Sequence, residues 1–294
     1  MGNRIRTPID MASESRTSLE LLDRRLWRRH YFIPTEHGAW IWWIGPFLIG
    51  LAAGGRIDLD ALVLLLAVGA AFFLRQPASI AVKALSGRRP RSDLAPGLFW
   101  SAAYTLLMLL AVLALIRSGH TALLWLALPG VIVFGWHLWL ISRREERGQR
   151  GIELVAAGVL ALAAPAAYWV ADGSERLEPW VLWGLTWLQS AASIVYVYHR
   201  LEQRRLTAMP SVAERWRTGA RTLVYHAFNL AVALGLTLLG RVPALVSLAF
   251  GLMMLDALEG VAHPPVGARP AAIGLRQLGA SLAFVAVMLA AYLT

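Results

Sequence analysis

The chain contains no cysteine and little charge, and each absence excludes a class of function. Without cysteine, the protein has neither disulfides nor thiolate ligands for a metal or redox centre. Charged residues make up only 16% of the 294 residues, whereas 57% are hydrophobic. Soluble domains contain about 25% charged residues. The composition therefore indicates a protein whose surface faces lipid.

Acidic residues are also scarce, with 18 against 28 basic ones and a net charge of +10. A strongly basic chain often binds nucleic acid, but such proteins gather their basic residues in one continuous patch or stripe. Here the basic residues form short clusters between apolar runs, as in the loops of membrane proteins. We expect the lipid bilayer as the main partner and no nucleic acid.

Apolar runs long enough to cross a bilayer recur along the chain. A helix of about 20 residues crosses the hydrocarbon core, and this length divides the sequence into about nine candidate spans. They lie near residues 38–55, 59–77, 96–116, 121–141, 152–171, 179–199, 221–239, 242–258 and 273–293. The seventh and eighth are short, so they are either two spans or one hairpin that does not fully cross. The predicted fold class is an all-α, polytopic transmembrane helical bundle.

The positions of the basic residues predict the orientation of this bundle. With nine spans and a cytoplasmic N-terminus, only Arg56, Arg117, Arg176 and Arg241 of the 28 basic residues fall outside the cytoplasm. Short cytoplasmic loops are enriched in Lys and Arg, so we predict this topology.

The chain is predicted to have two parts. The charged stretch LDRRLWRRH excludes a secretory signal, so residues 1–33 form a basic cytoplasmic tail, and residues 34–294 form the transmembrane domain. Within the tail, residues 17–30 are either a helix on the inner leaflet or a disordered segment.

Polar residues collect at the predicted cytoplasmic ends of the spans, where function is therefore expected. Glu36 and His37 precede the first span and either transfer protons or cap the helix. Pro77 should bend or unwind the second span and free its carbonyls. Beside it, Arg75 and Lys83 offer cations to an anionic ligand, although such residues also serve topology alone.

Further candidates come from the second half of the chain. His226 is predicted to be catalytic. The spacing of Asp256, Glu259 and His263 places them on one helix face, which suggests a metal or proton site. The other predicted ligand-binding residues are Glu153, Arg200, Asn229, Arg269 and Gln277.

The stretch Pro34, Glu36, His37, Gly38, Ala39 and Trp40, followed by an apolar span with Pro46, resembles the start of the YwiC-like family of bacterial membrane proteins. Arg75-Gln76-Pro77 resembles the polar end of that family's second helix, which adds Gln76 to the ligand-binding candidates. The resemblance covers most of the chain from about residue 31. It implies a multi-pass protein of the bacterial inner membrane, but supplies no biochemical activity.

Nine helices with polar loops after the second and sixth also resemble the UbiA-type prenyltransferases in architecture. Those enzymes hold Mg²⁺ with Asp-rich motifs, whereas the corresponding segments here read RQPASIAVKALSGRRP and YVYHRLEQRR. A diphosphate would then require Arg and Lys, unless Asp256 and Glu259 hold a divalent cation.

Three functions follow from these observations. The first is a cytoplasm-facing pocket that binds or modifies an isoprenoid- or lipid-like anionic ligand. The second is a small-anion transporter, which the lack of ionisable residues in the outer half disfavours. The third is a non-catalytic assembly subunit of a membrane complex, with haem between His37 and His226 as its least favoured variant. The sequence does not decide whether the protein is an enzyme.

Overall fold

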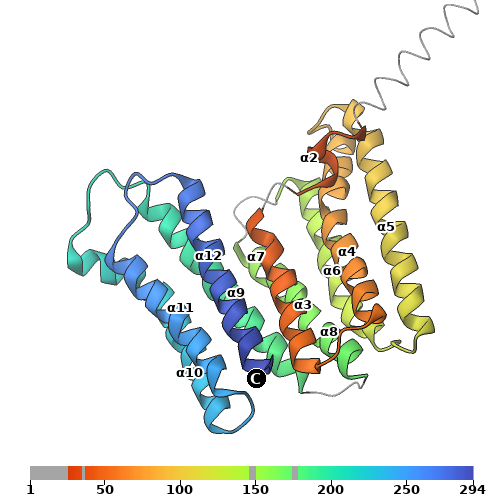
Figure 1. Cartoon of the computed structure of the whole chain (residues 1–294). Helices are drawn as coiled ribbons and strands as arrows, with labels where there is room; N and C mark the ends of the chain where they lie inside the picture. The colour runs from red at the N-terminus through yellow and green to blue at the C-terminus, as the bar shows by residue number, and fades with distance from the viewer. Residues whose placement is uncertain (1–25, 35–36, 146–149, 174–177, 294) are drawn as a thin grey trace, which may run out of the picture. The chain divides into compact units, whose positions relative to one another are not determined.

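The computed structural model describes residues 26–34, 37–145, 150–173 and 178–293, and in these ranges every regular element is a helix (Figure 1). The all-α prediction is confirmed. The predicted helix over residues 17–30 lies mostly outside the described residues. The elements are α2 (Arg29–Phe32), η1 (His37–Trp40), α3 (Ile41–Gly54), α4 (Leu59–Leu85), η2 (Arg91–Asp93), α5 (Leu94–Arg117), α6 (Leu123–Arg143), α7 (Arg150–Ala161), α8 (Ala163–Asp172), α9 (Pro179–Gln203), α10 (Val212–Leu238), α11 (Ala244–Ala262) and α12 (Pro270–Leu293).

Each of the nine predicted spans coincides with helical structure. In the described part, seven helical segments are long and apolar enough to cross a membrane. The first predicted span is shorter, an apolar helical segment at Gly38–Gly54. The seventh, α10, has 27 residues but is not among the seven. The helices are therefore confirmed, whereas the count of nine crossings and the orientation stay predictions.

Two local details differ from expectation. The helix α4 is not unwound at Pro77 but continues as one element of 27 residues. The fifth span is divided at Leu162, between α7 and α8. Pro165 explains this break, since it has no amide hydrogen to bond the carbonyl one turn earlier.

The chain divides into two compact units, each assembled from separate segments. The described residues of the first unit lie within 26–34, 66–112 and 134–145, and those of the second lie within 37–65, 113–133, 150–173 and 178–293. The boundary falls inside α4, α5 and α6, so these helices contribute to both units.

In the first unit, aromatic and polar side chains hold the segment around α2 against η2 and α5. The indole of Trp100 donates to the Leu26 carbonyl at 2.7 Å, and the Tyr104 hydroxyl donates to the Phe32 carbonyl at 2.9 Å. The Tyr31 hydroxyl donates to Asp93 Oδ1 at 2.7 Å. These bonds join residues more than sixty positions apart and order the chain directly before the first span.

In the second unit, α3 packs against α8 at two glycines one turn apart. A Cβ added at Gly50 would lie 2.9 Å from the Ala164 carbonyl carbon and closer still to its oxygen. A Cβ at Gly54 would lie 2.6 Å from that of Ala171. Small residues at such contacts let transmembrane helices approach closely.

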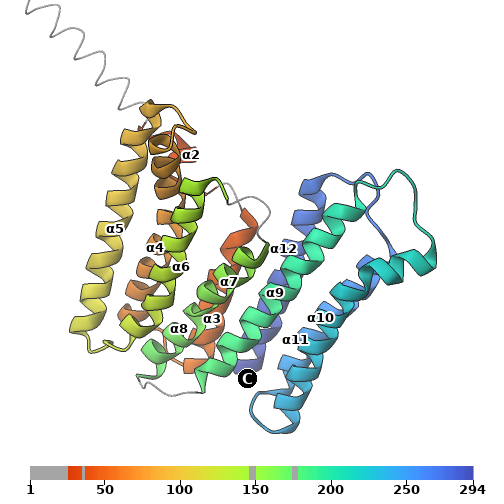
Figure 2. The same cartoon turned by 180° about the vertical axis from the view of Figure 1, so that it is seen from behind.

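The second unit also contains α9, α10, α11 and α12. Figures 1 and 2 show α10 and α11 side by side, and Gly219 on α10 leaves room for Val261 on α11. The core between α11 and α12 contains Phe250 against Phe284, with ring centroids 5.1 Å apart, and the fully buried Met288. This packing holds α12, which lines one of the cavities described below.

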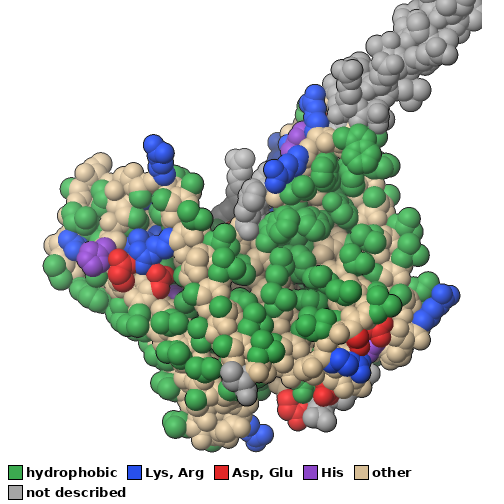
Figure 3. All heavy atoms as spheres, in the orientation of Figure 1, with side chains coloured by type: hydrophobic (Ala, Val, Ile, Leu, Met, Phe, Trp, Pro, Cys, Tyr) green, Lys and Arg blue, Asp and Glu red, His purple; other side chains and the backbone are tan. Residues whose placement is uncertain are grey.

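Hydrophobic side chains are spread over the whole face shown in Figure 3, whereas charged side chains are confined to a few groups. On α5, Leu106, Leu109 and Leu110 are all more than half exposed. A soluble protein rarely exposes such contiguous apolar surface, and lipid satisfies it.

Candidate functional site

The residues predicted at the start of the first span lie at the edge of the described chain. Glu36 is outside the described residues, and of His37 only the backbone is described, as the first residue of η1. Their catalytic role therefore stays a prediction.

Three predicted ligand-binding residues belong to α4 in the first unit. Gln76 donates its amide to the His30 carbonyl at 3.0 Å, so it helps to hold the segment around α2. The Lys83 carbonyl accepts the backbone amides of Arg88 and Arg89 at 2.8 and 3.1 Å, which ends the helix. The backbone carbonyl of Arg75 accepts a hydrogen bond from the hydroxyl of Ser79, one turn later, at 2.7 Å. Contact of these side chains with a ligand stays a prediction.

The predicted metal residues have a cationic partner in the second unit. Arg276 donates to Asp256 Oδ1 at 2.7 Å and also to the Glu259 carboxylate. His263 Nδ1 lies 3.4 Å from Glu259 Oε1. The described residues contain no group of three or more His, Cys, Asp or Glu arranged to hold a metal ion. Arg276 thus contributes one positive charge against two carboxylates, and a metal role for these residues stays a prediction.

Arg200 is buried and connects α9 to the end of α11. Its side chain is 6% exposed and donates to the carbonyls of Gly260 and His263, the latter at 2.8 Å. The guanidinium also lies 5.8 Å from the centroid of the Tyr196 ring. These contacts give Arg200 a structural role between two helices.

His226 and Asn229 are buried and face α9, and their predicted catalytic and ligand-binding roles stay predictions. The His226 ring packs edge-on against Tyr196, with centroids 5.9 Å apart, and Nδ1 lies 2.9 Å from the Thr222 carbonyl. Asn229 donates to the Leu188 carbonyl at 2.8 Å. Neither residue lines the two cavities described below.

The remaining three candidates occupy separate positions in the second unit. Gln277 donates to the Ser193 hydroxyl at 2.6 Å, and Glu153 accepts the Tyr198 hydroxyl at 2.7 Å. Arg269 is exposed, directly before α12. The structure thus brings Gln277 and Glu153 to α9, on which both cavities are built.

A pocket of about 100 Å³ lies between α7, α9 and α10, and we call it the α7–α9–α10 pocket. The side chain of His199 is only 8% exposed, and its Nε2 has no hydrogen-bond partner in the described chain. Exposed Glu202, Thr218 and Arg221 lie around it. The full lining is Leu154, Ile194, Val195, Tyr198, His199, Glu202, Thr218, Arg221 and Thr222.

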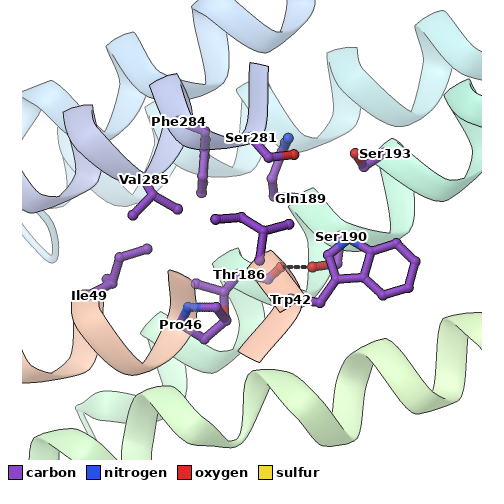
Figure 4. Close-up of a pocket in the computed structure, with 11 residues that line it drawn as sticks. Trp42, Pro46, Ile49, Thr186, Gln189, Ser190, Ser193, Ser281, Phe284 and Val285 are labelled. Atoms are coloured by element: carbon purple, nitrogen blue, oxygen red, sulfur yellow. Dashed lines mark hydrogen bonds between the residues drawn. The ribbon is translucent and has the colours of Figure 1, made fainter. Parts of the chain in front are cut away.

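A smaller cavity of about 30 Å³ lies between α3, α9 and α12, and we call it the α3–α9–α12 cavity (Figure 4). Its lining contains no charged side chain. The residues are Ile41, Trp42, Pro46, Ile49, Thr186, Gln189, Ser190, Ser193, Ser281, Phe284 and Val285.

Sequence reasoning did not select His199, Arg221 and Gln189 as site residues. A usable signal existed for Gln189, because an amide in the middle of an apolar span is costly and usually functional. For Arg221 the signal was misleading, since its position at a span end matched a purely topological role.

The helices and their apolar surfaces define a multi-pass integral membrane protein. Comparison with known families gives a match to the family described as YwiC-like protein over residues 33–168. The predicted resemblance to that family is confirmed there, but the matched stretch ends at residue 168, well short of the extent expected from the sequence. No curated protein and no solved structure matches the chain, and the UbiA-like arrangement stays a prediction.

Proposed function

We propose that the protein is a multi-pass protein of the bacterial inner membrane that binds an amphipathic, isoprenoid- or lipid-like ligand in the α7–α9–α10 pocket. The observation that carries this proposal is the composition of that pocket. Apolar and ionisable side chains line the same small space, and a molecule with an apolar chain and a charged head matches both.

The apolar part of the lining suits a hydrocarbon chain. Leu154 of α7 and Ile194 and Val195 of α9 form this part. The helix α7 is fixed against α9 by indole hydrogen bonds at 2.8 Å, from Trp183 to the Gly158 carbonyl and from Trp187 to the Leu154 carbonyl. The pocket wall is therefore held before any ligand arrives, which reduces the entropic cost of binding.

The polar part suits an anionic head. Arg221 supplies a cation, and its guanidinium lies 5.9 Å from the centroid of the Tyr225 ring, which restrains it. The unpartnered Nε2 of His199 offers a further hydrogen bond. Glu202 also lines the pocket, so side chains of both charges surround the proposed head.

The surroundings of the pocket favour the cytoplasmic side. Arg204, Arg205, Arg215 and Arg217 follow in the loop after α9 and the first turns of α10. Such an accumulation is typical of cytoplasmic loops and attracts anionic lipid heads.

A photoreactive long-chain alkyl phosphate tests this function on the purified full-length protein in lipid nanodiscs. We expect crosslinks on Leu154, Ile194 or Val195. Replacing Arg221 by Gln should lower this labelling about fivefold, because a charge contact at an exposed site contributes up to about 1 kcal/mol.

The matched control is Arg217→Gln, one turn earlier on the same helix, exposed and outside the pocket lining. It should leave the labelling unchanged. Labelling that is equal in both variants, or absent from the pocket in the unmodified protein, rejects the proposal.

A further inference from the structure

The α3–α9–α12 cavity is separate in lining from the α7–α9–α10 pocket, since the two have no residue in common. Its volume of about 30 Å³ exceeds the roughly 10–15 Å³ that one water molecule requires. The space accommodates one small polar group and no ring or chain. Its occupant is therefore the end of a molecule or water.

The side-chain amide of Gln189 is an unsatisfied hydrogen-bonding group in this cavity. The side chain is 6% exposed, and neither its amide nitrogen nor its amide oxygen has a partner in the described chain. Figure 4 shows it among the residues that line the space between α9 and α12. An unsatisfied buried polar group costs about 1–3 kcal/mol, so an occupant that both donates and accepts is strongly favoured.

The neighbouring hydroxyls complete the pattern. Ser193 accepts the Gln277 amide at 2.6 Å, which leaves its own hydroxyl hydrogen available to an occupant. Thr186 and Ser190 instead donate to backbone carbonyls of α9, at 2.8 and 2.9 Å. The cavity thus offers donors from Gln189 and Ser193, and acceptors from Gln189 and the other hydroxyls.

We propose that this cavity binds the uncharged hydroxyl or carbonyl end of a hydrophobic molecule. The absence of charged groups from its lining excludes an anion, because burying a charge without a partner is far more costly than burying a hydroxyl. The apolar walls contributed by Pro46, Phe284 and Val285 fit the first carbons behind the polar end.

The rest of such a molecule can extend from the cavity to the protein surface. Ile41 and Trp42 form one side of the cavity and are only half-buried, whereas Pro46 and Ile49 deeper on α3 are buried. An apolar chain leaves between the two half-buried side chains, since only the polar end fits inside. This binding site is independent of the proposed function.

A photoreactive long-chain alcohol, with the same chain as the alkyl phosphate above, tests the inference on the full-length protein in nanodiscs. We expect crosslinks on Ile41, Trp42 or Phe284. Replacing Gln189 by Leu should reduce them about tenfold, since two hydrogen bonds of about 0.5–1.5 kcal/mol each are lost. The alkyl phosphate should not label these residues.

The matched control is Gln203→Leu. Gln203 is also a buried glutamine of α9 without an amide partner in the described chain, but it does not line the cavity. It should leave the alcohol labelling intact. Ser193→Ala provides a milder second variant, with a loss of about threefold expected from one hydrogen bond.

Two results overturn the inference. One is alcohol labelling that persists in the folded Gln189→Leu protein, and the other is no labelling of the cavity, which means that water alone occupies it. Arg221→Gln separates this site from the proposed function. It should lower labelling by the phosphate about fivefold and leave labelling by the alcohol unchanged.

Discussion

The contact between α3 and α8 gives the sharpest test of the structure, through the substitution Gly50→Ala. The added methyl would lie within 3.0 Å of both the Ala164 carbonyl carbon and its Cα, and closer to the oxygen. These are backbone atoms of a helix and cannot rotate away. Helix α3 must therefore move off α8, and the buried Ile49 beside Gly50 moves with it.

The magnitude follows from two opposing effects. Overpacking of a well-packed contact lowers stability by about 1–3 kcal/mol. Alanine in place of glycine within a helix raises stability by up to about 1 kcal/mol. We expect a net loss of about 1–2 kcal/mol for Gly50→Ala. Gly235→Ala is the matched control, because nothing in the described chain lies within 4 Å of the added methyl. It should stabilise the protein by about 0.5–1 kcal/mol.

Unfolding by sodium dodecyl sulfate in mixed micelles, followed by far-ultraviolet circular dichroism, measures both changes on the same scale. The two variants should differ by about 2 kcal/mol, with opposite signs relative to the unmodified protein. Equal stability of the two variants refutes the close approach of α3 to α8. It would also remove the support for the α3 wall of the α3–α9–α12 cavity.

Two further predictions concern the charged cluster and the topology. The substitution Arg276→Gln leaves Asp256 and Glu259 without their cation. The free energy of unfolding should therefore fall by about 1 kcal/mol, the value for partly exposed ion pairs. The control is Arg269→Gln at an exposed position, which should not change the same titration. Because the chain has no cysteine, single cysteines report topology without background: Thr121→Cys should react with an impermeant maleimide from outside, and Ser211→Cys only after permeabilisation. Reaction of both from one side contradicts nine spans.

The helices were predictable because lipid imposes a simple rule on sequence. Every backbone group in the hydrocarbon must bond within its own helix, so continuous apolar runs of sufficient length become helices. The division at Leu162 was not predicted, because the effect of Pro165 on the preceding carbonyl depends on local geometry. The interhelical bonds of Trp183 and Trp187 were also missed, since interfacial tryptophans have the same spacing near span ends.

The candidate site was less predictable than the fold for a related reason. The sequence shows that polar residues exist at span ends, but not which neighbours they meet. Gln76 and Arg200 were predicted to bind a ligand, which stays a prediction, but the sequence did not show that both donate to backbone carbonyls of the protein. The reverse holds for Gln189, which attracted no attention in the sequence and has no partner in the described chain.

The end of the family match coincides with a change in the kind of residue that the chain contributes to the two cavities. The matched stretch ends at residue 168, before α9 begins. Up to that point the chain supplies only apolar lining, which is Leu154 for the α7–α9–α10 pocket and four residues of α3 for the α3–α9–α12 cavity.

Every polar side chain that lines either cavity comes from α9, α10 or α12. Polar groups determine which ligand head is accepted, because an apolar wall discriminates weakly between chains. We therefore infer that ligand choice is encoded in the part of the chain that the family match does not reach. In a chimaera with another YwiC-like protein, replacing the residues after 168 should change which ligand is bound. Replacing residues 33–168 should leave the ligand unchanged.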